Sequence, residues 1–320
     1  MSIAILGSGA FGTALACVLA EDGQDIWLWS RSTHQTRGMA RTRTNPKLPD
    51  VTLHDNITPT SVIDDISTAS VVLLAVPAQQ TSAILAKYAN KIPDVPVILC
   101  AKGIDLKTFQ LQTDIAAKFL PNHSAAVLTG PGFATEIAQG LPTALTLSYQ
   151  FLSRGEELQH QLSTDRMRLY LTRDIIGAQL GGALKNVIAI GAGIVMGARL
   201  GESARAALVT RGFTEMRRLG VAMGGQEETF TGLSGLGDLM LTCGSKMSRN
   251  FAQGFALGSG AQKDTTQTVE GVATAQAACA LATKYNVEMP ITRVVAAVLA
   301  DEITVEQAVE ALLSRPLKQE

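Results

Sequence analysis

Three glycines near the start of the chain constrain the fold more than any other feature. Gly7, Gly9 and Gly12 have the spacing G-x-G-x-x-G, with a short apolar run at residues 3–6 before them and a longer one at residues 13–20 after them. These runs are typical of a buried strand and a helix. In that setting the first glycine permits a tight turn, the second lets backbone approach a pyrophosphate, and the third lets the helix pack on the sheet. The pattern predicts a dinucleotide-binding turn.

The second expected strand, residues 25–29, indicates which dinucleotide is preferred. It ends in Ser30, Arg31 and Ser32, and not in the acidic residue that usually binds the ribose 2′-hydroxyl of NAD. A carboxylate would repel a 2′-phosphate, whereas Arg31 and the hydroxyls would accept one. This favours NADPH, or tolerance of it. The alternative is that Arg31 is an ordinary solvated loop residue.

Short apolar runs alternate with helical segments over the first half of the chain. Residues 33–56 read as a helix followed by an irregular loop, and residues 78–88 as a helix. Strands are expected at 71–76, 95–100, 125–129, 144–147 and 169–172. This alternation predicts a parallel, doubly wound sheet, which binds ligands beyond the carboxyl ends of its strands. Three such ends stand out, at residues 7–12, 102–103 and 130–134.

Beyond about residue 174 the chain reads as almost wholly helical. The length of 320 residues can hold two domains. We therefore expect an α/β N-terminal domain, a Rossmann-like doubly wound sheet, at residues 1–180 and an all-α C-terminal domain at residues 181–320.

Charge and cysteine content narrow the possible partners. The net charge of −1 gives no electrostatic reason to expect nucleic acid or a membrane. The cysteines and histidines are scattered, so no metal site is expected, and the cysteines are interpreted as core residues in a reducing compartment. The apolar segment 187–198 is too short and glycine-rich to span a bilayer. Because no signal-like segment precedes the first strand, we expect a soluble cytoplasmic protein.

Two polar residues interrupt the apolar segment 175–198. Lysine is almost never fully buried unless it is paired, so Lys185, next to Asn186, should point into a polar cavity. The alternative is a lysine that snorkels from the helix edge. Five of the six glycines in the segment suggest that other backbone approaches it closely: Gly181, Gly182, Gly191, Gly193 and Gly197.

Two further groups could carry chemistry. Asp238 follows a glycine-rich stretch, where it could equally be a helix cap. Ser248, Arg249 and Asn250 combine a cation with two hydrogen-bonding residues. Arginine binds phosphate in a bidentate fork, although a surface arginine at a helix start would look the same.

Together these motifs resemble those of the bacterial-type NAD(P)-dependent sn-glycerol-3-phosphate dehydrogenases over essentially the whole chain. In chain order, the residues that carry the resemblance are those at 7–12, 101–103, 130–134, 180–186, 237–239, 241–243, 248–250 and 269–271. The resemblance implies a 6-phosphogluconate-dehydrogenase-like fold. It also implies interconversion of dihydroxyacetone phosphate and sn-glycerol 3-phosphate with NADP or NAD, which supplies phospholipid synthesis.

The resemblance also implies roles for single residues. Lys185 would be the acid–base residue, with Lys102 lowering its pKa and binding substrate, and Asp238 orienting it. Substrate contacts would come from Lys102, Gly130, Gly132, Asn186, Asp238, Thr242, Ser248, Arg249 and Asn250. Cofactor contacts would come from Gly7, Gly9, Ala10, Phe11, Gly12, Arg31, Lys102, Ala134, Arg249, Val269 and Glu270. Gly132 departs from the Ser or Thr common in the family, so only backbone N–H groups remain there.

Three alternative functions would fit parts of this sequence. A β-hydroxyacid dehydrogenase or a ketopantoate reductase would lack the Asp238 and Ser248–Asn250 motifs. A nucleotide sensor without turnover would need no polar residues such as Lys185 within the helical domain, and a scaffold that only dimerises through helices is a third alternative. A homodimer is expected, because the glycine-rich apolar helix is a candidate for its interface, although that helix could equally be buried within the monomer.

Overall fold

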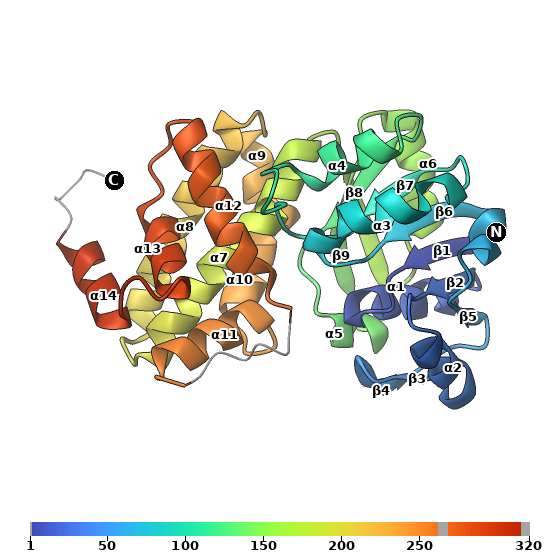
Figure 1. Ribbon diagram of the computed structural model, residues 1–320, viewed down its shortest axis with the longest axis horizontal. Coiled ribbons are helices and arrows are strands. Elements are labelled where there is room, and N and C mark those ends of the chain that lie inside the picture. The colour runs from blue at the N-terminus through green and yellow to red at the C-terminus, as the bar shows by residue number, and fades with distance from the viewer. Residues whose placement is uncertain (1, 262–267, 315–320) are drawn as a thin grey trace.

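The computed structural model describes residues 2–261 and 268–314 and divides into a sheet domain and a helical domain (Figure 1). The sheet domain contains the following strands and longer helices: β1 (Ser2–Leu6), α1 (Ala10–Glu21), β2 (Asp25–Trp29), α2 (Thr33–Thr42), β3 (Thr44–Asn45), β4 (Leu48–Thr52), β5 (Ile57–Thr60), β6 (Ala69–Leu74), α3 (Thr81–Tyr88), β7 (Val97–Leu99), α4 (Gln112–Phe119), β8 (Ala125–Thr129), α5 (Ala134–Ala138), β9 (Thr143–Ser148), α6 (Leu152–Leu162) and β10 (Met167–Thr172).

The strand order confirms the Rossmann-like prediction. The sheet runs β10-β9-β8-β7-β6-β1-β2-β5, and the six strands from β5 to β8 are parallel. β2 and β5 lie on one side of β1, and the chain then crosses to the other side of β1 to form β6, so the strand order reverses between β1 and β6. A ligand on a doubly wound sheet binds at such a switch point, beyond the carboxyl ends of the strands.

The predicted parallel sheet has one antiparallel pairing, at one edge. β9 pairs antiparallel with β8, and β10 then pairs parallel with β9. The helix between β8 and β9 has 5 residues, which span only about 7 Å. That helix is too short to carry the chain back along a whole strand. The 11-residue helix α6 is long enough, so β10 runs parallel to β9.

The prediction of an irregular loop before residue 56 is wrong. α2 is followed by a small antiparallel pair, β3 and β4, and β5 then forms the outer edge of the main sheet. Pro59 lies within β5 and conceals it in the sequence, but an edge strand tolerates a proline. Helices α4 and α6 were not predicted either.

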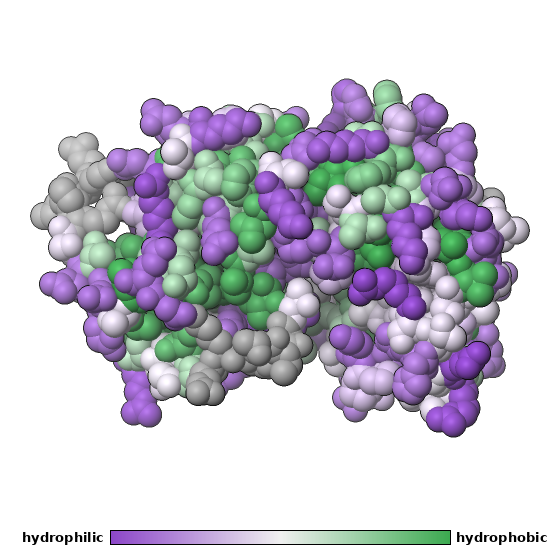
Figure 2. Space-filling model, viewed as in Figure 1, coloured by the Kyte–Doolittle hydropathy of each residue, from purple (hydrophilic) through white to green (hydrophobic). Residues whose placement is uncertain are grey.

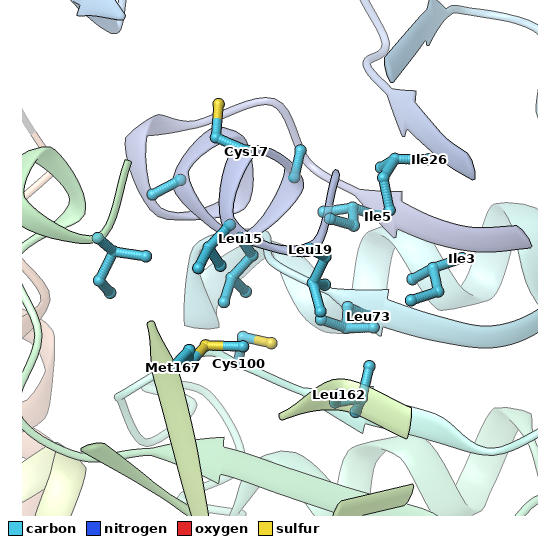
Figure 3. Packing of buried hydrophobic residues seen from close by; sticks show 14 of the residues in the cluster. Ile3, Ile5, Leu15, Cys17, Leu19, Ile26, Leu73, Cys100, Leu162 and Met167 are labelled. Atoms are coloured by element: carbon cyan, nitrogen blue, oxygen red, sulfur yellow. The ribbon is translucent and has the colours of Figure 1, made fainter. Parts of the chain in front are cut away.

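The first helix packs on the sheet through its apolar side. In Figure 3, Leu15 and Leu19 of α1 lie over Leu73 of β6 and over Cys100, which directly follows β7. Cys17, Cys100 and Cys243 are buried, as expected for core residues, whereas Cys279 is half-buried. This core fixes the start of α1 at the carboxyl edge of the sheet.

The second domain is all helical in its described residues. Its helices are α7 (Ile175–Gly197), α8 (Glu202–Ala222), α9 (Glu227–Thr231), α10 (Asp238–Cys243), α11 (Arg249–Gly258), α12 (Glu270–Lys284), α13 (Pro290–Leu299) and α14 (Val305–Leu313), with a π-helical turn at Leu233–Gly237 before α10. α7 runs unbroken through residues 180–181. The division into a dinucleotide-binding part, residues 1–180, and a substrate-binding part, residues 181–320, stays a prediction.

The apolar helix α7 is the centre of this domain (Figure 1). The whole helix is long and apolar enough to cross a membrane, whereas the segment 187–198 alone is too short. However, 94% of the most apolar window of α7 is buried inside the protein. A Cβ at Gly193 would lie 2.1 Å from the Phe251 carbonyl oxygen, and one at Gly254 of α11 would lie 2.0 Å from the Ile190 oxygen. The predicted close approach of backbone is therefore confirmed here.

Candidate active site

Helix α7 places Lys185 at the junction of the two domains. Its side chain is buried, its Nζ lies 2.8 Å from Asp238 Oδ1, and it donates a hydrogen bond to Thr242 Oγ1 at 2.6 Å. The lysine therefore points into a polar site and does not snorkel to the surface. Gly182, one turn earlier, lets α7 approach the end of β8, because a Cβ there would lie 2.5 Å from Thr129 Oγ1.

Asp238 is the first residue of α10 and links two lysines. Its Oδ1 faces Lys185 and accepts a hydrogen bond from the Thr242 hydroxyl at 3.1 Å, while its Oδ2 lies 2.7 Å from Lys102 Nζ. No side chain caps α10, so a simple capping role for Asp238 is excluded. The preceding π-helical turn, a feature frequent at functional sites, brings the carboxylate into this position.

Lys102 joins the sheet domain to this cluster. It follows β7 in a segment without helix or strand, and its Nζ donates to the Gly130 carbonyl oxygen at 2.7 Å. The same Nζ lies 5.8 Å from the centre of the Phe11 ring. The three strand ends predicted to form a site thus meet, together with Asp238 of the helical domain.

Burial and neighbouring charges shift the pKa values of Lys185 and Asp238. Burial lowers the pKa of Lys185 to about 8, with Lys102 acting in the same direction and Asp238 opposing it. Burial alone would raise the pKa of Asp238, but the two ammonium groups hold it below its ordinary value. At neutral pH the site therefore contains a carboxylate between two ammonium groups, one of which releases its proton readily.

An amide chain extends from this cluster across the helical domain. Asn186 donates to the Lys102 carbonyl oxygen at 3.0 Å, and its own oxygen accepts from Asn250 Nδ2 at 2.8 Å. The Asn250 oxygen in turn accepts from the Gly271 backbone N–H at 3.0 Å. These bonds tie the starts of α11 and α12 to the lysines.

The glycine turn fits a dinucleotide. A Cβ on Gly7 would lie 2.4 Å from the Ala75 oxygen and one on Gly12 would lie 2.0 Å from the Gly7 oxygen, so packing within the protein requires both glycines. A Cβ on Gly9 would meet no protein atom within 4 Å. Internal packing therefore leaves the space over Gly9 open, and a pyrophosphate can approach the backbone and the N-terminus of α1 there.

The strand end at residues 30–32 differs in detail from the prediction. Arg31 is exposed beyond β2, as a 2′-phosphate ligand should be. The hydroxyls have local roles, because Ser30 donates to Gln35 Oε1 at 3.2 Å and Ser32 accepts from the Gln35 N–H as the cap of α2. Arg31 is thus left as the main candidate contact to that phosphate.

Glu270, at the start of α12, reaches back to the sheet domain. Its Oε1 accepts from the Ala78 backbone N–H at 3.0 Å, beyond the end of β6. Burial raises the pKa of Glu270, against the effects of the Ala78 N–H and of Arg249. The neighbouring Val269 is half-buried at the cap position of the same helix. The two domains therefore also meet beyond the end of β6, beside Gly103, where an added Cβ would lie 2.8 Å from Glu270 Oε2.

The remaining predicted residues lie around this junction. Arg249 is exposed at the start of α11, and Ser248 is buried because its hydroxyl caps that helix, accepting from the Phe251 N–H at 3.2 Å. A Cβ at Gly132 would lie 2.8 Å from Ile137, so a side chain there would press on α5. The residues predicted to line the cofactor pack at the edge of one core cluster: Ala10, Phe11 and Ala134.

One residue at the glycine turn was missed by the sequence analysis. Asn45 is fully buried, and its Nδ2 donates to the Ser8 carbonyl oxygen at 3.1 Å and to Thr13 Oγ1 at 2.6 Å. Gln35 also donates to the Ser8 oxygen, at 3.2 Å. Asn45 lies in the segment predicted as a loop, so no pattern marked it as buried.

Models of known families match both domains. The N-terminal model of NAD-dependent glycerol-3-phosphate dehydrogenase matches residues 2–153 and its C-terminal model matches residues 174–310. The glycerol-3-phosphate dehydrogenase (NAD(P)+) of Paracoccus denitrificans is 51% identical over 320 residues and the full length of both chains. That of Cereibacter sphaeroides is 50% identical over 318 residues, which cover 99% of this chain and all of that one.

Solved structures agree with these matches. The glycerol-3-phosphate dehydrogenase of Coxiella burnetii superposes with a TM-score of 0.94 at 38% identity, covering 98% of this chain and 99% of that one. A ketopantoate reductase from Ralstonia eutropha, at 16% identity and a TM-score of 0.63, shares the fold alone. That enzyme type was the main rival among the alternatives. The chain belongs to the NAD-dependent glycerol-3-phosphate dehydrogenase family.

Proposed function

We propose that the protein reduces dihydroxyacetone phosphate to sn-glycerol 3-phosphate with NADPH or NADH, and catalyses the reverse reaction. The observation that carries this proposal is the contact between Lys185, Asp238 and Lys102 beside the glycine turn. It supports an acid–base role for Lys185, a buried residue of the helical domain whose cluster reaches Phe11 of the glycine turn through Lys102. The notch between the two domains is visible in Figure 2.

The bound dinucleotide supplies the hydride that converts the keto carbon to an alcohol. Lys185 donates a proton from Nζ to the oxygen of that carbon as negative charge develops on it. Its pKa of about 8 is near the working pH, which suits a general acid. In the reverse direction the neutral amine takes the proton from the substrate hydroxyl.

Lys102 and Asp238 prepare this proton transfer. An ammonium group has three N–H donors, and Lys102 directs two of them to Gly130 and Asp238, which leaves the third for the substrate oxygen. Its positive charge also favours proton release from Lys185. Asp238 holds the two ammonium groups in place and keeps Lys185 protonated until the substrate needs the proton.

The substrate phosphate binds at the start of α11. Arg249 and Asn250 lie in its first turn, where free backbone N–H groups and the helix dipole also favour an anion. Ser248 fixes this turn and can donate its own O–H. The other substrate contacts come from the backbone around Gly130 and Gly132 and from the side chains of Asn186 and Thr242.

The dinucleotide binds at the glycine turn. It is held there by Gly7, Gly9, Ala10, Phe11, Gly12 and Ala134, and it is covered by Arg249, Val269 and Glu270.

A spectrophotometric assay tests the proposed reaction directly. NADPH or NADH absorbance should fall when dihydroxyacetone phosphate is added to the purified protein, and ketopantoate should cause no such fall. Absence of oxidation with both cofactors would contradict the proposal. Binding of NADPH with no turnover would instead support a nucleotide sensor.

The pH dependence should follow Lys185. Because the reduction needs its protonated form, kcat/KM for dihydroxyacetone phosphate should be level below the pKa of about 8 and fall above it. The oxidation of glycerol 3-phosphate needs the neutral amine, so its kcat/KM should rise through the same pH. Initial rates in both directions between pH 6 and 10 check this, and parallel profiles would contradict it.

Arg31→Asp should move cofactor preference toward NADH. The aspartate would repel the 2′-phosphate and accept a hydrogen bond from the 2′-hydroxyl of NAD. We expect the ratio of kcat/KM for NADPH to that for NADH to fall at least about tenfold, because a charge-assisted bond is worth about 1.5–3 kcal/mol. Steady-state kinetics with each cofactor measures the ratio, and an unchanged ratio would make Arg31 a plain surface residue.

Location and assembly are also part of the proposal. A reducing, cytoplasmic setting suits the scattered cysteines, of which three are buried. We expect a homodimer, with neither nucleic acid nor membrane as a partner. Residues 1–180 bind the dinucleotide and residues 181–320 bind the substrate phosphate.

A further inference from the structure

The segment that carries Lys102 is held by side-chain amides. Residues 100–111 contain no helix or strand, so regular backbone bonding does not fix them. Three successive carbonyl oxygens each accept a hydrogen bond from a side-chain amide. The Lys102 oxygen accepts from Asn186 at 3.0 Å, the Gly103 oxygen accepts from Gln112 at 3.0 Å, and the Ile104 oxygen accepts from Gln79 at 2.7 Å. The path of the backbone beside Lys102 therefore depends on these amides.

Gln112 is the most enclosed of the three amides. Both Gln112 and Thr81 are 1% exposed, and the Thr81 hydroxyl donates to Gln112 Oε1 at 2.6 Å. That bond orients the amide, so its Nε2 points to the Gly103 oxygen. A buried carbonyl that loses such a partner is costly to leave unpaired.

We propose that Gln112, oriented by Thr81, is a positioning residue that sets where the Lys102 ammonium lies. This inference rests on the proposed function. Gln112 does not reach the substrate, since its amide contacts Thr81 and Gly103, and it acts through the peptide next to Lys102. Gln79 supports the same segment on the other side, because its Oε1 also accepts from the Leu106 N–H at 3.0 Å.

A displaced Lys102 would change the titration of Lys185. The groups that shift Lys185 are Asp238 and Cys243 on α10 and Lys102 on this segment. Lys102 lowers the pKa of Lys185, so moving it away should raise that pKa. The alkaline fall of kcat/KM in the reduction should then occur at higher pH, which a general loss of stability would not cause.

The chain offers matched controls. Gln179 of α7 is also buried and also bonds the start of α4, accepting from the Thr113 N–H at 3.1 Å and donating to its hydroxyl at 2.9 Å. It does not bond the Lys102 segment. Thr81→Val removes the orienting hydroxyl with little change in shape, whereas Thr81→Ser keeps it.

The experiment compares the pH dependence of kcat/KM among these variants. Gln112→Met and Thr81→Val should lower kcat/KM at least about tenfold, because small misplacements of a catalytic group are costly, and should shift its alkaline midpoint upward. Gln179→Met and Thr81→Ser should keep the wild-type midpoint. Equal midpoints in all four variants would overturn the inference, and if Gln112→Met does not fold, the Thr81 pair decides.

A second readout needs no turnover. A crystal structure of Thr81→Val should show Lys102 Nζ displaced from Asp238 and from the Gly130 oxygen, and an unmoved Nζ would overturn the inference. Failure of the wild-type protein to reduce dihydroxyacetone phosphate would count against the proposed function alone, because this structural test would still stand.

Discussion

Lys185→Met should lower kcat for dihydroxyacetone phosphate reduction by about 10²–10⁴-fold, the range for loss of a general acid. Methionine has a similar length and is apolar, so it fits the buried position on α7 and removes only the proton donor. Asp238 keeps Lys102 as an ion-pair partner at 2.7 Å, so the fold should persist. Single-turnover oxidation of NADPH measures the chemical step, and fluorescence titration measures cofactor binding, which should stay within a few-fold of wild type.

Lys246→Met is the matched control for this prediction. Lys246 is an exposed lysine of the same domain, with its Nζ 3.9 Å from the centre of the Phe255 ring. Its loss should leave kcat unchanged. Wild-type turnover in Lys185→Met would end the acid–base assignment, and a loss of NADPH binding would show that Lys185 acts on the cofactor site instead.

Asp238→Asn should reduce both activity and stability. The Lys185 ammonium loses the carboxylate that raises its pKa, while burial and Lys102 still lower it, so its pKa should fall below about 8. The alkaline fall of kcat/KM in the reduction should therefore move to lower pH, opposite to the shift expected for Gln112→Met. Removing one partner of a buried ion pair costs about 3–5 kcal/mol of unfolding free energy.

The sign of the stability change with pH follows from the same groups. Because the folded-state pKa of Asp238 is lowered, its carboxylate stabilises the wild-type fold at every pH above its ordinary value of 3.8. In the variant, the Lys185 pKa is depressed further below its ordinary 10.5. The unfolding free energy that Asp238→Asn loses relative to wild type should thus be largest at low pH and become smaller as the pH rises toward about 8.

Urea unfolding at pH 6, 7 and 8 measures this deficit. Asp174→Asn is the control, since Asp174 is also buried but bonds backbone alone: it caps α7, accepting from the Gly177 N–H at 2.8 Å, and its other oxygen accepts from the Gln226 N–H at 2.7 Å. It should cost about 1–3 kcal/mol, because an asparagine leaves one of these N–H groups unpaired, with no change in the pH–rate profile. A deficit for Asp238→Asn that does not vary with pH would contradict the buried-charge explanation.

The sequence predicted those parts of the fold that local patterns encode. The glycine turn, the strands around it and the helical second half all follow from periodicity and spacing. Lys185 could be singled out because a lysine within an apolar helix is costly unless it is paired. Its partners could not be assigned from spacing, because Asp238 is 53 residues away and Lys102 is 83 residues away along the chain.

The features that were missed depend on tertiary contacts. The direction of β9 depends on the length of α5, and the edge strand β5 contains a proline that local rules place in a turn. Asn45 and Gln112 are ordinary polar residues in the sequence, and only the folded chain shows that they bond the Ser8 and Gly103 carbonyl oxygens. The hydroxyls of Ser248 and Ser32, which are predicted to bind ligands, also accept backbone N–H bonds as helix caps, a role that only the folded chain shows.

The glycine contacts between α7 and α11 have a consequence for redesign of the enzyme. Gly193 and Gly197 on one helix and Gly254 and Gly258 on the other each lie where a methyl group would overlap backbone. No larger residue fits at these four positions at the present spacing of the two helices, so a substitution there would have to move the helices apart. Attempts to change the substrate should therefore leave these four glycines in place.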